Sequence, residues 1–81
     1  MNRIKTETWI LIAQSLDGGS CSKYVALYSI WSELNKPEIH QDSLTLIRGL
    51  LLSTKVNKED LVNTELLSAC RTKLSEIIKV S

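Results

Sequence analysis

The side chains that could catalyse a reaction or bind a metal are few in this chain of 81 residues, and they are scattered. His40, the one histidine, falls in a connector near Pro37 and has no obvious nucleophile or orienting group beside it. Cys21 and Cys70 are far apart and form no CxxC pair. A structural zinc site needs four nitrogen or sulfur donors, which these residues cannot supply. The sequence therefore predicts no metal site. We expect both cysteines to be reduced and partly buried, and the alternative is a single disulfide between them if the domain is secreted.

Three short patterns are similar to catalytic or cofactor motifs, but helix formation explains each of them. Glu59 and Asp60 are adjacent carboxylates that fall where a helix begins, and negative charge is favourable there. Residues 17–20 are glycine-rich yet lack the GxxxxGK[ST] pattern of a phosphate loop. Residues 42–44 are similar to the serine segment of carrier proteins that bears a phosphopantetheine arm, and capping accounts for them equally. We therefore predict that the protein is not an enzyme and has no cofactor.

Length and charge restrict the remaining classes. The chain is long enough for a single domain, residues 1–81, with a thin core. Ten basic and nine acidic residues give a formal net charge of +1, so no strong field steers the protein toward nucleic acid or anionic lipid. The longest apolar run, residues 9–13, is too short to span a membrane and lacks the cleavage site of an export signal. The expected compartment is the cytoplasm.

Apolar residues recur at helical spacing in four stretches, which predicts an all-α fold. We expect a small four-helix bundle or an orthogonal helical array, in which short connections place successive helices antiparallel. The predicted helices lie near residues 6–16, 22–34, 42–53 and 58–79. Residues 1–5 are expected to fray, apart from Ile4, which could dock on the bundle.

The stretch from Leu44 to Leu52 is predicted to form the central helix of this bundle. Its apolar residues do not keep to one stripe, because Leu46 and Leu52 point away from the main face. A helix that is apolar nearly all round must be covered on several sides. Gly49 lies inside this stretch, and we expect it to let another helix approach closely.

Polar residues ahead of each stretch are predicted to cap the helices. The candidates are Thr6, Ser20 or Ser22, Asp42 or Ser43, and Asn57. The pattern around Asn57 is the strongest, because Val56 and Leu61 are spaced to form a hydrophobic staple across the cap.

The sequence contains more large apolar side chains than so small a bundle can cover. We therefore expect an apolar patch that another protein or a second copy of the chain covers. The candidate partner-binding residues are Trp9, Tyr24, Tyr28, Trp31, Leu46 and Leu52. This interpretation predicts a non-enzymatic module that acts by protein–protein binding, as an adaptor, an inhibitor or immunity-type protein, or an accessory subunit.

The alternative is a small helical regulator that binds DNA or RNA through its last helix, with Arg71 and Lys73 as contacts. A helix-turn-helix often marks its turn with glycine, and residues 63–64 are a poor substitute. The basic residues of this region alternate with acidic ones, which is more typical of a solvated surface. The sequence thus favours protein binding over nucleic-acid binding.

Some segments resemble known families. Residues 4–6, 20–23 and 30–34 are similar to parts of the small helical cofactor subunit of coronavirus replicase polymerases. The leucine-rich helix followed by a long last helix resembles pediocin-type bacteriocin immunity proteins. Both resemblances imply action by contact with another protein rather than by catalysis.

Overall fold

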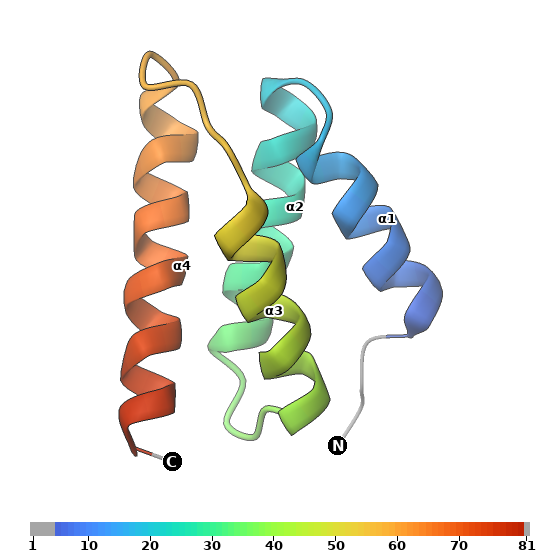
Figure 1. Ribbon diagram of the computed structural model, residues 1–81, viewed down its shortest axis with the longest axis vertical. Coiled ribbons are helices and arrows are strands. Elements are labelled where there is room, and N and C mark those ends of the chain that lie inside the picture. Colours follow the sequence, from blue (N-terminus) through green and yellow to red (C-terminus); the bar gives the residue numbers. More distant parts are fainter. Residues whose placement is uncertain (1–4, 81) are drawn as a thin grey trace.

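The computed structural model describes residues 5–80, apart from the side chain of Val80 (Figure 1). This part of the chain holds four α-helices and no strand, which confirms the predicted small all-α bundle. The helices are α1 (Thr6–Leu16), α2 (Ser20–Leu34), α3 (Gln41–Ser53) and α4 (Leu61–Val80). The expectations for residues 1–4, including the docking of Ile4, lie outside the described residues.

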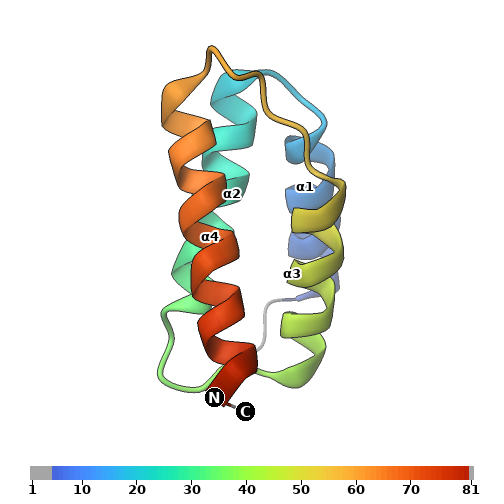
Figure 2. The same ribbon diagram turned by 60° about the vertical axis from the view of Figure 1, so that its left-hand side comes forward.

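The helices alternate in direction along the chain, so α1 and α3 run one way while α2 and α4 run the other (Figure 1). Successive helices are therefore antiparallel, as expected from their short connections. The two parallel helices α2 and α4 lie side by side in both views, with α3 and α1 on the other side of the bundle (Figure 2). The α2–α4 pair makes the most extensive contact in the fold, followed by α1–α2.

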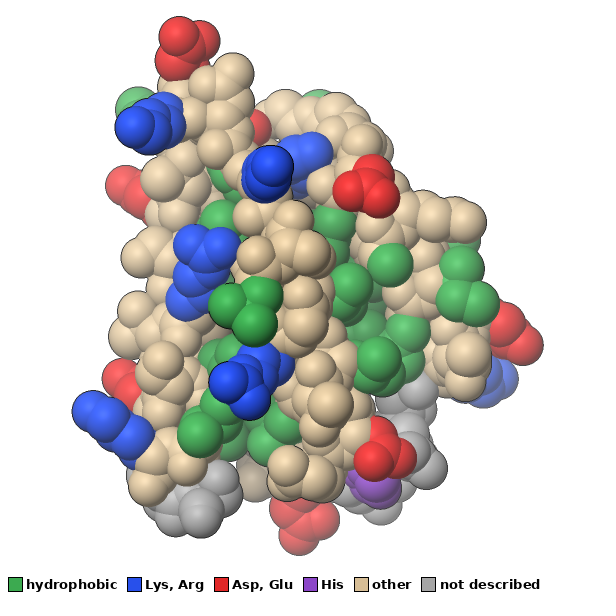
Figure 3. All heavy atoms as spheres, in the orientation of Figure 1, with side chains coloured by type: hydrophobic (Ala, Val, Ile, Leu, Met, Phe, Trp, Pro, Cys, Tyr) green, Lys and Arg blue, Asp and Glu red, His purple; other side chains and the backbone are tan. Residues whose placement is uncertain are grey.

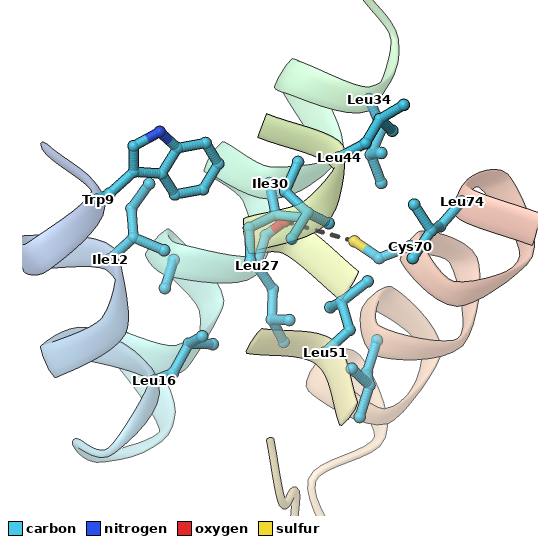
Figure 4. Packing of buried hydrophobic residues seen from close by; sticks show 13 residues of the cluster. Trp9, Ile12, Leu16, Leu27, Ile30, Leu34, Leu44, Leu51, Cys70 and Leu74 are labelled. Atoms are coloured by element: carbon cyan, nitrogen blue, oxygen red, sulfur yellow. Dashed lines mark hydrogen bonds between the residues drawn. The ribbon is translucent and has the colours of Figure 1, made fainter. Parts of the chain in front are cut away.

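Helix α2 supplies the centre of the core. Its residues Ala26, Leu27, Ile30 and Leu34 are at most 1% exposed, and they meet apolar side chains from the other three helices (Figure 4). Removing a side chain such as that of Leu27 would typically cost about 2–5 kcal/mol, because the cavity cannot collapse fully. The central position predicted for residues 44–52 therefore belongs to α2, which packs against both α1 and α4.

Helix α3 buries a single stripe rather than its whole circumference. Leu44, Ile47 and Leu51 are buried, whereas Leu46 and Leu52 remain 46% and 74% exposed. Gly49 also differs from the expectation, because a Cβ built there would meet no atom within 4 Å. Among the residues that the structure describes, no helix approaches Gly49 closely.

The N-caps of the first three helices also differ from the sequence predictions. Lys5 precedes α1 and Gly19 precedes α2, and neither provides a side-chain cap. At α3 the cap is His40, whose Nδ1 accepts a hydrogen bond from the backbone N–H of Asp42 at 3.2 Å. Because the helix termini leave backbone N–H groups unsatisfied, this contact gives the one histidine a structural role.

The last helix begins at Leu61, and Asp60 rather than Asn57 caps it. The carboxylate of Asp60 accepts hydrogen bonds from the Asn63 backbone N–H at 3.3 Å and from the Ser20 hydroxyl at 2.5 Å. The Asn63 amide donates to Asp60 Oδ2 at 2.8 Å and to the Ser20 carbonyl at 2.9 Å. Asn57 instead accepts from the Glu59 backbone N–H within the preceding turn. The start of α4 is thus tied to the start of α2.

We predict that Gly49→Ala stabilises the fold by up to about 1 kcal/mol, because alanine favours the helix and no neighbour opposes its methyl group. Urea unfolding followed by circular dichroism measures the change. Gly18→Ala is the control, since a Cβ there would lie 3.0 Å from the Ser22 Cβ and should bring no gain. A loss of stability in Gly49→Ala would mean that a helix does approach this position.

Asp60 should make the stability depend on pH. Hydrogen bonds from Ser20 and from the Asn63 backbone lower the pKa of Asp60 below its ordinary value of 3.8. The stabilisation is therefore present above pH 3.8 and is lost as the pH falls further through the lowered pKa. The wild type should melt at a higher temperature than Asp60→Asn at neutral pH, and the difference should shrink near pH 2. Glu59→Gln serves as the control, and an equal pH dependence in both variants would contradict this assignment.

Candidate protein-binding grooves on either side of helix α3

Helix α3 lies between two open grooves. Hydrophobic side chains are visible on both sides of α3, toward α1 and toward α4 (Figure 3). The α1–α3 groove has a volume of about 450 Å³, and the α3–α4 groove has a volume of about 540 Å³. Both grooves follow from the single buried stripe of α3, because the side chains at the two margins of the stripe have no helix packed over them.

The α1–α3 groove is apolar. Its principal lining residues are Trp9, Ile10, Ala13, Leu46, Gly49 and Leu50. Ile10 and Leu46 are 53% and 46% exposed, and they project from α1 and α3 respectively. Gly49 keeps the groove open because it has no side chain to fill it. Among the described residues no charged side chain lines this groove, so its chemistry suits another apolar surface.

The α3–α4 groove combines an apolar floor with basic margins. Helix α3 contributes Arg48, Leu51 and Leu52, and helix α4 contributes Arg71, Leu74, Ile78 and Lys79. The Arg71 guanidinium donates a hydrogen bond to the Leu51 carbonyl at 2.9 Å. This carbonyl belongs to the last turn of α3, where unsatisfied C=O groups and the helix dipole favour a positive charge. Arg71 therefore links α3 to α4 and borders the groove.

The structure divides the predicted partner-binding residues among separate places. Trp9 and Leu46 line the α1–α3 groove, although Trp9 is only 8% exposed and belongs mainly to the core. Leu52 lines the α3–α4 groove. The remaining three residues lie on α2 and line neither groove. Tyr24 and Tyr28 are exposed, and their rings stack with centroids 6.1 Å apart. Trp31 is half-buried and packs against the core.

The two residues proposed for nucleic-acid contact are also separated. Arg71 lines the α3–α4 groove, whereas Lys73 does not. Arg71 and Lys73 are two positions apart, which corresponds to about 200° of rotation around an α-helix. Their side chains therefore point to nearly opposite sides of α4. The structure therefore does not bring them together on one recognition surface.

The sequence reasoning missed several residues that line the grooves. In the α1–α3 groove these are Ile10, Ala13 and Leu50, and in the α3–α4 groove they are Arg48, Ile78 and Lys79. A helical wheel of residues 41–53 would have shown which side chains flank the buried stripe. It could not show which neighbouring helix each margin faces, because that depends on the packing of the whole bundle.

The side chains with catalytic potential stay apart. Burial raises the pKa of the Cys70 thiol to about 11, and its Sγ donates to the Leu27 carbonyl at 3.5 Å (Figure 4). His40 is occupied as a cap, and Cys21 is exposed on α2. Within residues 5–80, no group of three or more His, Cys, Asp or Glu side chains gathers where it could hold a metal ion.

The described helices include none with the length and hydrophobicity needed to cross a membrane.

Comparisons with known proteins give no relative. No family model, no curated protein and no solved structure matches this chain.

The two cysteines should differ sharply in reactivity. The thiolate is the reactive form, so a buried thiol with a pKa of about 11 should resist alkylation at pH 8, while the exposed Cys21 should react. Intact-mass analysis after iodoacetamide treatment should show labelling of Cys21 alone in the folded protein. In denaturant both cysteines should be labelled, which is the control. Rapid labelling of Cys70 in the folded protein would mean that the α2–α4 contact opens readily.

Proposed function

We propose that this protein is a non-enzymatic helical module that acts by binding another protein, as an adaptor, an inhibitor or an accessory subunit. The observation that carries the proposal is the pair of open grooves with exposed apolar side chains on either side of α3. Protein interfaces use contiguous apolar surface of this kind. Its removal from water by a partner makes the free energy of binding more favourable.

The size of this gain is substantial for a small protein. Full burial of an isoleucine or leucine side chain contributes about 1.5–3 kcal/mol. Ile10 and Leu46 are each about half-exposed, so covering both would contribute roughly 1.5–3 kcal/mol together. Positions that dominate binding energy lie in pockets that the partner fully removes from water.

The two residues predicted to contact nucleic acid do not support that alternative. Arg71 lines the α3–α4 groove and Lys73 does not, so the pair does not share one face of α4. Arg71 also uses one of its donors on the Leu51 carbonyl. Catalysis has less support, because His40 and Cys70 are both engaged in structural hydrogen bonds.

The proposal predicts that one charge in the α1–α3 groove abolishes binding. Ile10→Asp would place a carboxylate in the groove, so a partner captured by the immobilised wild-type protein from its native host's lysate should be lost. Leu11→Asp is the matched control, because Leu11 is 61% exposed on the same helix and does not line the groove. Equal capture by both variants would exclude the α1–α3 groove as the binding surface.

The oligomeric state separates the two kinds of partner. Light scattering of the purified protein should give the mass of a monomer, 9.1 kDa, if the groove serves another protein. A wild-type dimer that Ile10→Asp converts to a monomer would instead assign the groove to a second copy of the chain.

A further inference from the structure

We infer that the α3–α4 groove binds an acidic amphipathic helix, one with an apolar stripe flanked by carboxylates. This inference rests on the proposed protein-binding function and specifies the chemistry of the partner. It follows from the charge, the floor and the length of the groove.

The charged side chains that line the α3–α4 groove are all basic. Arg48, Arg71 and Lys79 border the α3–α4 groove, and Lys55 and Lys58 border a second hollow that shares Arg71 with it. Among the described residues, no Asp or Glu side chain lines either hollow. Lys and Arg side chains follow the α3–α4 side of the face seen in Figure 3. Such a row is complementary to a partner that carries carboxylates.

Helix geometry produces this separation of charge from a mixed sequence. Within α4, Glu65 precedes Arg71 and Glu76 falls between Lys73 and Lys79, but neither glutamate lines either hollow. Because each residue advances about 100° around a helix, neighbours in sequence face different directions. The lining of the groove therefore includes Arg71 and Lys79 from α4 and leaves out both glutamates.

The floor of the groove is aliphatic. Leu51 and Leu74 are buried and form its base, while Leu52 and Ile78 are 74% and 47% exposed and form its sides. The apolar stripe of an amphipathic helix fits between two helices in this way, with its flanking polar residues placed at the basic margins. A fully polar ligand would leave these aliphatic side chains in contact with charge, which is unfavourable.

The length matches a helix of a few turns. From Arg71 to Lys79, α4 borders the groove over about 12 Å, since an α-helix rises 1.5 Å per residue. The second hollow extends this border to Thr64, which gives about 22 Å in total. A partner helix of roughly 8–15 residues would cover the groove or the groove with its extension.

Nucleic acid fits the same surface less well. Among residues 5–80, no aromatic ring on which a base could stack lines either hollow. The whole chain carries a formal charge of only +1, so long-range attraction to a polyanion is weak. Duplex DNA is therefore included in the test as the competing ligand.

Fluorescence anisotropy with a synthetic probe tests this inference. The probe is a labelled helical peptide of about 15 residues with leucines on one face and glutamates flanking them. A second peptide keeps the leucines and replaces every glutamate with lysine. We expect the acidic peptide to bind, and the affinity to fall with added salt because the basic residues are exposed. The lysine peptide should not bind.

Two pairs of variants locate the site. Arg48→Glu combined with Lys79→Glu should weaken binding by about tenfold or more, whereas Lys73→Glu, outside the groove, should have little effect. Leu52→Gln should weaken binding, while Leu61→Gln should not, although Leu61 is similarly exposed at 70%. Thermal melts check that each variant folds. If the charge reversal unfolds the protein, Arg48→Gln combined with Lys79→Gln should still weaken binding.

The outcomes distinguish this inference from the proposed function. Failure of the acidic peptide to bind, equal binding of the lysine peptide, or tighter groove-dependent binding of duplex DNA would each overturn the inference. Binding that survives the Arg48 and Lys79 variants would overturn it as well. If partner capture still depends on Ile10 in any of these cases, protein binding through the α1–α3 groove stands and only the acidic chemistry fails.

Discussion

The contact between α2 and α4 is the constraint on which the fold depends. Leu27 and Ile30 are fully buried at the middle of α2, and Cys70 on α4 is buried against the Leu27 carbonyl. A chain this short buries only about 60% of the surface that its unfolded form exposes, so its core is thin. Once α2 is enclosed by α1 and α4, α3 can cover only the remaining open side. The two margins of the buried stripe of α3 are exposed because only one side of α2 is left for α3 to cover.

Helical periodicity predicted the existence, order and approximate limits of all four helices, because apolar spacing depends on local geometry alone. The caps were harder to predict, because several polar residues precede each helix and the exact first residue decides which of them is the cap. Asp60 was assigned to the first turn of α4, but it precedes that helix and caps it by accepting a hydrogen bond from the Asn63 backbone N–H, while a second hydrogen bond joins it to Ser20 on α2. The prediction that Gly49 lets another helix approach closely was also wrong. The sequence around a glycine does not show whether another helix lies beside it.

The candidate site was predictable only in part. Leu46 and Leu52 were identified because they fall outside the main stripe of α3, and both line grooves. Tyr24 and Tyr28 are exposed as an excess of apolar bulk implies, yet they lie on α2 away from both grooves. The basic margin of the α3–α4 groove was missed, because Arg48 and Lys79 come together only when the two helices pack. The chemistry of a groove between helices is therefore a property of the packed bundle.

The hydrogen bond between Ser20 and Asp60 joins residues 40 positions apart and has a consequence for how the chain assembles. The hairpin of α1 and α2 can form early from local contacts, but the rest of α2 stays uncovered until α4 arrives. Because α4 follows α2 in the chain, the part of the core that these two helices share, including Leu27 and Cys70, can form only after α4 has been synthesised.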